Sequence, residues 1–233
     1  MESATIAHPH CDGCFTGVKH SGEPVGNTVT IADIPTYVSE PPPSVATRSG
    51  PKKIVLFFSD VYGLFYLNNQ LLQDYFAAQG FFVVGIDYFF GAPIQSHTEE
   101  GFDRNAWIMS SHAKALEIAP KWVEQVRKQY GTDGKYCAVA AFAHPGLLTE
   151  DHFKNLKHPL LMSCAESDFT FPTELRRRAE DILVENKAQY HIQVFSGVQH
   201  GFAVRGDMEK PNARWAKEES ARGISAWFTR FSA

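Results

Sequence analysis

The sequence lacks an excess of basic residues, a dense set of cysteines and any long hydrophobic run. Lys and Arg number 22 against 26 Asp and Glu, for a net charge of −4, so the charge balance does not favour nucleic acid or an anionic membrane as a partner. Four scattered cysteines are too few for a disulfide scaffold and indicate reduced thiols. The N-terminus lacks the pattern of a secretory signal, and the most apolar windows, 54–58 and 81–86, are too short to span a bilayer. We therefore expect a soluble, cytoplasmic protein that acts on small molecules.

The residues that are present predict an α/β fold. The 233 residues are 44% hydrophobic and 13% aromatic, which excludes disorder and allows one α/β domain. Residues 1–50 are irregular and rich in turn formers, with a candidate strand pair at 28–31 and 36–39. From residue 51 to 233, short apolar runs alternate with amphipathic stretches. This pattern predicts a single domain overall, with a mostly parallel, doubly wound sheet after the irregular N-terminal segment.

The expected elements follow from the apolar spacing. A helix is predicted from about residue 68 to 79 with Asn68 as its N-cap, and a second over 104–130, broken or capped near Pro120. Further strands are predicted at 135–143, 159–164 and 190–195, and a last helix begins near Pro211.

Two loops after late strands carry the residues of greatest chemical interest. In open parallel sheets ligands bind beyond the carboxyl ends of the strands. Asp168 follows the strand that ends in Cys164, and His200 follows the strand that ends in Phe195. An acid and then a histidine, each past a late strand, is the order found in hydrolases whose nucleophile lies earlier in the chain. Isolated Asp and His residues in loops are usually turn or surface residues, so this interpretation depends on its context.

The surrounding residues supply that context. Segments 161–172, 197–206, 58–64 with 68–70, and 84–91 resemble motifs of the dienelactone hydrolase family, a branch of the α/β-hydrolases, and 14–22 is similar to the opening of fungal members. The resemblance covers nearly the whole chain. It implies an esterase or lactonase for small ester or lactone substrates, with a nucleophile–His–Asp mechanism and neither a metal nor an organic cofactor.

The resemblance also implies roles for individual residues. By position, Asp168 is the orienting acid and His200 the general base and acid. Asp60 stands where bacterial members carry a glutamate that restrains the thiolate in the resting enzyme, and the backbone N–H of Val61 would be an oxyanion donor. Arg205 falls near an arginine associated with the carboxylate of the substrate.

The nucleophile elbow of the family is missing from this sequence. There is no Gly-x-Cys-x-Gly or Gly-x-Ser-x-Gly, and Cys137 has Tyr136 and Ala138 as neighbours. Residues 135–144 suffice for one strand, whereas the family has two strands with a helix between them, and a parallel crossover needs about a dozen connecting residues or more. We therefore expect a sheet shorter by one strand–helix unit. Cys137 is a weak nucleophile candidate against a buried structural thiol.

Three interpretations stay open at this point. The chain is a hydrolase of this family, a truncated or alternatively spliced member that binds a ligand or a partner without catalysis, or the product of a mistaken exon junction near Val139 and Ala140. A zinc site is not predicted, because the His and Cys residues near the N-terminus do not form two paired sets on a hairpin or helix. The sequence does not determine the substrate or the oligomeric state.

Overall fold

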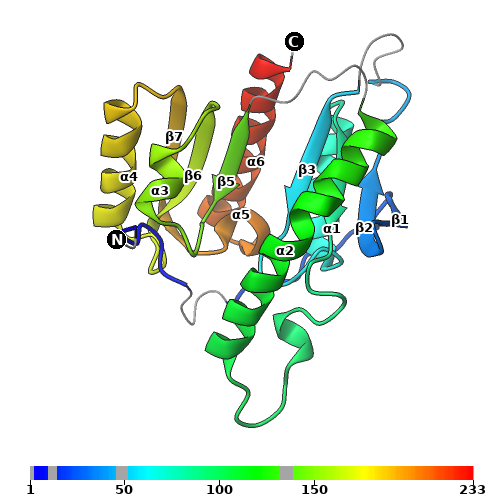
Figure 1. The fold of residues 1–233 in the computed structure, drawn as a ribbon, viewed down its shortest axis with the longest axis horizontal. Coiled ribbons are helices and arrows are strands. Elements are labelled where there is room, and N and C mark those ends of the chain that lie inside the picture. The colour runs from blue at the N-terminus through cyan, green and yellow to red at the C-terminus, as the bar shows by residue number, and fades with distance from the viewer. Residues whose placement is uncertain (1–2, 10–14, 46–51, 132–138, 233) are drawn as a thin grey trace. The chain divides into compact units, whose positions relative to one another are not determined.

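A computed structural model describes residues 3–9, 15–45, 52–131 and 139–232 (Figure 1). The chain divides into two compact units, one made of residues 1–18 and 137–233 and the other of residues 19–136. Both units combine strands with covering helices, and three of the five described strand pairings are parallel, among them both pairings of the late strands. The predicted α/β-hydrolase-like fold class is confirmed. The domain boundary at residue 50 stays a prediction.

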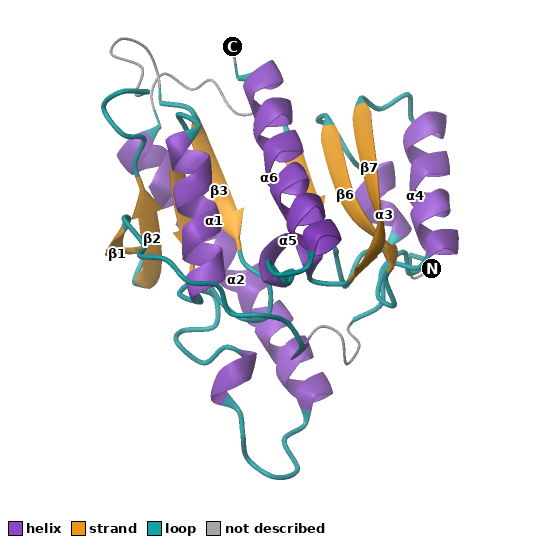
Figure 2. Cartoon of the chain, turned by 180° about the vertical axis from the view of Figure 1, so that it is seen from behind, coloured by secondary structure: helices purple, strands orange, loops and turns teal. Residues whose placement is uncertain are grey.

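The unit of residues 19–136 contains a four-stranded mixed sheet. Its strands are β1 (Asn27–Ile31), β2 (Ile34–Ser39), β3 (Ile54–Phe58) and β4 (Phe82–Ile86), in the order β1-β2-β4-β3. The pairs β1/β2 and β2/β4 are antiparallel and β3/β4 is parallel, so the expected N-terminal strand pair is confirmed. Helices α1 (Leu67–Ala78) and α2 (Arg104–Tyr130) lie on opposite faces of this sheet (Figures 1 and 2), and the short η2 (Ile94–Ser96) precedes α2.

Two details of these helices correct the sequence predictions. Helix α2 runs unbroken through Pro120, which is exposed, and Leu116, four residues earlier, is 64% exposed. Because that side faces solvent, water can satisfy the carbonyl that proline leaves unpaired. Helix α1 begins at Leu67 with Tyr66 as its N-cap, so Asn68 is not the cap. Asn68 is buried instead, and its side-chain oxygen accepts a hydrogen bond from the backbone N–H of His20.

The other unit contains a three-stranded, fully parallel sheet. Its strands β5 (Ala140–Ala143), β6 (Leu160–Ser167) and β7 (Tyr190–Gln199) lie in that order. Helices α3 (Glu150–Lys154) and α4 (Thr173–Glu185) cover one face, and α5 (Phe202–Arg205) and α6 (Pro211–Phe231) lie on the other (Figures 1 and 2). Strand β5 corresponds to the end of the strand predicted over 135–143. Residues 132–138 lie outside the described residues.

Successive side chains of β6 point to opposite faces of the sheet and contact the helices on both sides. Met162 and Cys164 pack in a core cluster with Ile182 of α4, whereas the hydroxyls of Ser163 and Ser220 of α6 lie 2.6 Å apart on the other face. This alternation is the period-two pattern of a strand covered on both sides. Ile6, from the N-terminal segment, is buried in the same cluster as Met162.

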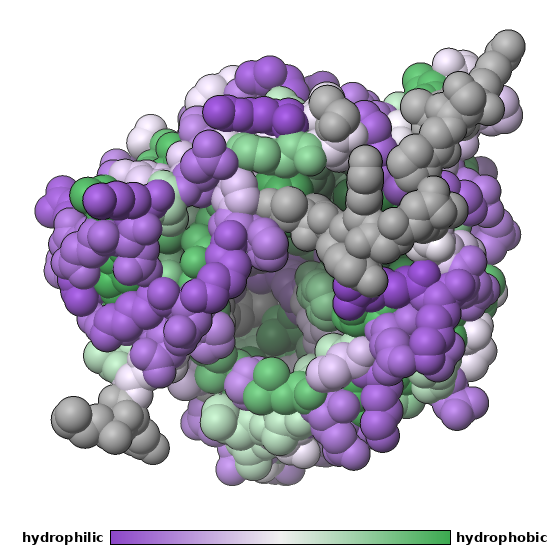
Figure 3. All heavy atoms as spheres, turned by 45° about the horizontal axis from the view of Figure 1, so that its top comes forward, coloured by the Kyte–Doolittle hydropathy of each residue, from purple (hydrophilic) through white to green (hydrophobic). Residues whose placement is uncertain are grey.

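The surface of the molecule is mostly polar in the view of Figure 3, where hydrophobic side chains show in smaller patches. Among the described residues, none of the helices combines the length and the apolar character that crossing a membrane requires.

Candidate active site

The register of two parallel strands places Asp168 and His200 side by side. Strand β6 pairs with β7, and the last pair of that ladder is Ser167 with Gln199. Asp168 directly follows β6, and His200 directly follows β7. Both strands extend further than their apolar patterns predict. The Nδ1 atom of His200 lies 3.0 Å from each carboxylate oxygen of Asp168. The structure therefore brings together the two residues that the sequence selected.

The Asp168 carboxylate is buried and surrounded by donors. Its side chain is 2% exposed, and Oδ1 accepts hydrogen bonds from the backbone N–H groups of Thr170 (2.9 Å) and Phe171 (3.2 Å). Burial alone would raise the pKa of Asp168. The hydrogen bond and positive charge of His200, with the hydroxyl of Thr170, outweigh it and hold the pKa below its usual range. At neutral pH this residue is a carboxylate.

The carboxylate determines which His200 nitrogen carries the proton. Because Nδ1 faces two carboxylate oxygens, we assign the hydrogen of the neutral ring to Nδ1, which leaves Nε2 as a proton acceptor. Gly201 follows with φ of 86°, a left-handed conformation that suits glycine, and turns the chain into α5. This arrangement can take a proton at Nε2 and stabilise the resulting imidazolium with Asp168.

Two further residues contact this pair, and the sequence reasoning did not assign either of them to the site. The Thr170 hydroxyl lies 2.9 Å from His200 Nδ1 and 2.7 Å from Asp168 Oδ1. The ring of His144 meets the His200 ring edge to face, with centroids 5.0 Å apart. Burial, and next the charge of His200, lower the pKa of His144 to about 3, so this buried ring is neutral. A hydroxyl residue two positions after the acid was the available sequence signal for Thr170.

Arg205 is buried in the same unit. It ends α5, its Nε donates to the backbone oxygen of Thr16 at 3.0 Å, and its own backbone oxygen accepts from Val18 N–H at 3.1 Å. These bonds anchor residues 16–18 to α5. A role for Arg205 towards a substrate carboxylate stays a prediction.

Asp60 and Val61 belong to the other unit, in the turn after β3. Asp60 Oδ1 accepts hydrogen bonds from the backbone N–H of Tyr62 (3.2 Å) and from the Asn69 side chain (3.0 Å), and Asn69 also donates to the oxygen of Gly63. The Val61 oxygen accepts from Ile94 N–H. The turn is thus fixed by α1 and by the first residue of η2, while the catalytic roles of Asp60 and Val61 stay predictions.

The structure describes one of the four cysteines, Cys164. Cys164 lies buried in β6, and burial raises its pKa to about 12, so it stays a thiol and is unsuited to be a nucleophile. Cys11, Cys14 and Cys137 lie outside the described residues. In the described ranges, no group of three or more His, Cys, Asp or Glu side chains is placed to hold a metal ion.

Known proteins resemble this chain over most of its length. The model of the dienelactone hydrolase family matches residues 129–232. The chain is 32% identical to dienlactone hydrolase 1 of Gibberella moniliformis, over 97% of this chain and 96% of that protein. It is 35% identical to dienlactone hydrolase 2 of the same organism, over 96% of this chain and 95% of that protein. The alignment with the first runs over 255 residues, more than the 233 of this chain, so this chain has no residue at some aligned positions.

Solved structures share the fold at low sequence identity. A dienelactone hydrolase-like promiscuous phosphotriesterase from metagenomic libraries has a TM-score of 0.67 and 16% identity, over 89% of this chain and 98% of that one. A thermophilic esterase from Thermogutta terrifontis has a TM-score of 0.57 and 13% identity, over 89% and 94% of the two chains. At such identities these likenesses establish the fold alone.

Proposed function

The chain belongs to the dienelactone hydrolase family, and from that premise we propose that it hydrolyses small ester or lactone substrates with Asp168 and His200 as its proton relay. The observation that carries this proposal is the 3.0 Å contact of His200 Nδ1 with both Asp168 oxygens. The buried ionised carboxylate faces the Nδ1 side of the ring, and the proposal assigns Nε2 to proton exchange with the reacting groups.

In the proposed reaction the relay moves one proton in each direction. His200 Nε2 takes the proton of the nucleophile while that nucleophile adds to the ester carbonyl, and Asp168 stabilises the imidazolium. The ring then gives the proton to the leaving alcohol oxygen as the carbon–oxygen bond breaks. Water, which gives a proton to Nε2, next attacks the acyl carbon, and the ring returns that proton to the nucleophile as the acid leaves. By family position we assign the Val61 N–H to the developing oxyanion. Asp60 takes the position of the glutamate that restrains the thiolate in the resting enzyme of bacterial members, and Arg205 is assigned to a carboxylate of the substrate. The proposal assigns no metal or organic cofactor.

A second candidate function is a noncatalytic member that keeps ligand binding. Its specific support is the absence of a Gly-x-Cys-x-Gly or Gly-x-Ser-x-Gly turn, with residues 131–139 alone between α2 and β5. That length is below the dozen or so residues of a parallel crossover. Cys137, a weak nucleophile candidate, falls in this interval. Sequencing the transcript across the codons of Val139 and Ala140 would test for a mistaken exon junction.

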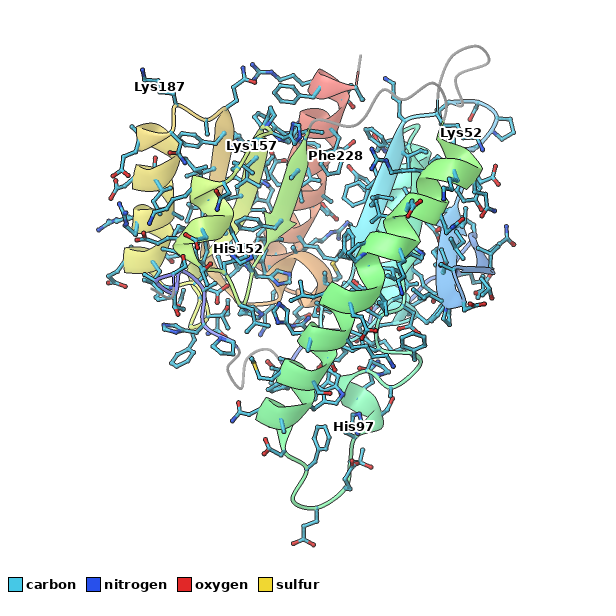
Figure 4. All side chains as sticks on the ribbon, viewed as in Figure 1. Lys52, His97, His152, Lys157, Lys187 and Phe228 are labelled. Carbon is cyan, nitrogen blue, oxygen red and sulfur yellow. The ribbon has the colours of Figure 1, made fainter. Side chains whose placement is uncertain are left out.

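The two candidates differ in turnover of a simple substrate. We expect p-nitrophenyl acetate and a small lactone such as dihydrocoumarin to be cleaved above the buffer rate, and His200→Ala to abolish that cleavage. The matched control is His152→Ala, because His152 is an exposed histidine of the same unit that caps α3 (Figure 4). Absence of cleavage in the wild type, with calorimetric binding of the lactone retained, would support the noncatalytic member.

The labelling of Cys137 is a separate question. If this cysteine is the nucleophile, its reaction with a thiol-directed probe depends on His200, whereas equal labelling of the wild type and His200→Ala would exclude that role. We also propose a cytosolic location, on the sparse and scattered cysteines alone.

A further inference from the structure

We propose that Thr170 is a positioning residue of the Asp168–His200 pair. Its side-chain hydroxyl holds the carboxylate and the imidazole ring in one geometry and ties both to the turn at Pro145. The inference rests on the proposed hydrolase function for its effect on turnover. Its effect on the His200 ring itself does not depend on turnover.

The contacts of the Thr170 hydroxyl carry the inference. Thr170 is fully buried, and its Oγ1 lies 2.7 Å from Asp168 Oδ1, 2.9 Å from His200 Nδ1 and 3.0 Å from the backbone oxygen of Pro145. A hydroxyl has one hydrogen and two lone pairs. It can donate to Asp168 or Pro145 while it accepts from the Nδ1–H of His200. One atom therefore contacts both members of the pair.

The pair by itself leaves the ring orientation weakly determined. His200 Nδ1 is 3.0 Å from both Asp168 oxygens, so the carboxylate offers two equal acceptors. Thr170 removes this equivalence, because its hydroxyl and its backbone N–H both approach Oδ1. With Oδ1 held in this way, the carboxylate plane is fixed, and the third contact sets the position of Nδ1. A relay that must meet a substrate atom gains from this rigidity.

Thr170 is itself held from the opposite side by the N-terminal segment. Its backbone oxygen accepts a hydrogen bond from His8 N–H at 2.6 Å, and the oxygen of His8 accepts from Leu147 N–H at 3.1 Å. His8 thus links the loop of Thr170 to the loop that follows Pro145. Ile6 and Ala7, just before it, are buried, so this link is anchored in the core. The hydroxyl of Thr170 is therefore presented from a rigid frame.

The first test reads the His200 ring directly. In Thr170→Val the side chain keeps its shape but loses the hydroxyl. From ¹H and ¹⁵N shifts of the histidine rings near neutral pH, we expect the wild type to show His200 with hydrogen on Nδ1 and a sharp Nδ1–H resonance. In Thr170→Val the Asp168 carboxylate keeps this tautomer, but without the hydroxyl contact the Nδ1–H resonance should shift and broaden. Thr170→Ser, which restores the hydroxyl, should recover the wild-type spectrum.

A matched control separates positioning from the loss of any buried hydroxyl. Thr36 is equally buried, in the other unit, and its hydroxyl bonds to Trp122 Nε1 and to the oxygen of Ile34. Thr36→Val should leave the His200 spectrum unchanged. If Thr170→Val does not fold by circular dichroism, Thr170→Ala replaces it, with the same expected change of the Nδ1–H resonance and the same recovery by serine.

The second test uses p-nitrophenyl acetate. We expect Thr170→Val to lower kcat by about tenfold or more with little change in KM, because a misplaced general base loses rate rather than binding. Thr170→Ser should stay within about twofold of the wild type. An unchanged His200 spectrum in folded Thr170→Val, or an equal disturbance in Thr36→Val, would overturn the inference. If the wild type cleaves no ester, the hydrolase proposal fails, and the ring spectra still decide the role of Thr170.

Discussion

The two units each place a buried aspartate directly after a parallel strand, but the two carboxylates differ in their partners. Asp87 follows β4, and its oxygens accept hydrogen bonds from the backbone N–H groups of Phe89 and Gly91. Asp168 follows β6 and adds an imidazole to its backbone donors, from His200, 32 residues along the chain. Both aspartates follow a parallel strand directly. They differ because His200, which follows the neighbouring strand β7, contacts Asp168.

The pKa directions of the two residues express this difference. Burial raises the pKa of Asp87, and its backbone hydrogen bonds do not compensate for that effect. Burial acts on Asp168 in the same direction, but His200 and Thr170 reverse the outcome and lower its pKa. Local amides are therefore enough to shape a turn, whereas a charged partner from another strand, with a side-chain hydroxyl, lowers the pKa of a buried carboxylate below its usual range. The comparison separates a turn residue from a relay residue.

The largest expected effect is on turnover. Asp168→Asn should lower kcat/KM for p-nitrophenyl acetate by about 10³- to 10⁴-fold, because an amide favours the wrong His200 tautomer. Asp87→Asn, the same change in the turn of the other unit, should cost less than about tenfold. Initial rates at pH 7 measure both. Similar losses in the two variants would remove the distinction between the two aspartates.

The next effect concerns the core of the unit that holds the relay. Ile6 is 1% exposed and packs with residues of β6 and α4, although it lies near the N-terminus. Ile6→Ala should lower the free energy of unfolding by about 2–5 kcal/mol, the usual cost of a cavity at a buried isoleucine. Urea denaturation followed by circular dichroism measures this loss. A change below about 0.5 kcal/mol, typical of surface sites, would show that the N-terminal segment is not part of that core.

A smaller effect is expected in the other unit, where a tyrosine hydroxyl organises the N-terminal strands. The Tyr37 hydroxyl lies 3.0 and 3.1 Å from the two Asp74 oxygens and accepts from the N–H of Gly26 at 2.7 Å. Tyr37→Phe should destabilise the protein by about 2 kcal/mol, the range for hydrogen bonds to a charged group, without affecting ester cleavage. Urea midpoints and initial rates test the two parts of this prediction separately. A loss of activity in folded Tyr37→Phe would contradict it.

The smallest expected effect is on the pH dependence of stability. The lowered pKa of Asp168 contributes stability above its unfolded value, which is lost as the pH falls through the folded pKa. The raised pKa of Asp87 acts in the opposite sense, because its folded form binds the proton more tightly and its contribution favours folding in acid. Unfolding free energies from pH 7 down to about pH 3 should therefore fall less steeply in Asp168→Asn than in the wild type. In Asp87→Asn they should fall more steeply. The reverse order would contradict both assignments.

Much of this fold can be predicted from the sequence, because apolar runs and amphipathic stretches report burial directly. The pairing of Asp168 with His200 was also predictable, since the carboxyl ends of parallel strands lie at one edge of a sheet. The full length of β6 and β7 was not, because the ladder has a register shift after Ala165 and resumes at Ser167 and Gln199, where no apolar pattern marks the strands. The role of Thr170 is not visible in the sequence, because it depends on the contact of its hydroxyl with His200, a residue from another strand end.

Other errors have equally local causes. Pro120 usually interrupts a helix, but its exposed position lets α2 continue, and exposure is not visible in a single sequence. Asn68 has the residue type of an N-cap, but a backbone contact from His20, distant in sequence, makes it a buried hydrogen-bond acceptor. In the first case solvent exposure allows the helix to continue, and in the second a tertiary hydrogen bond determines the role of the side chain. Neither effect can be read from local sequence preference.

A double-mutant cycle on the relay tests the central claim most directly. kcat/KM for p-nitrophenyl acetate is measured in the wild type, His200→Ala, Asp168→Asn and the double variant, with folding checked by circular dichroism. If Asp168 acts through His200, removing the carboxylate from a protein that already lacks the imidazole costs nothing more, so the double variant matches His200→Ala. Two losses that multiply in the double variant would show that the residues act independently and would contradict the relay.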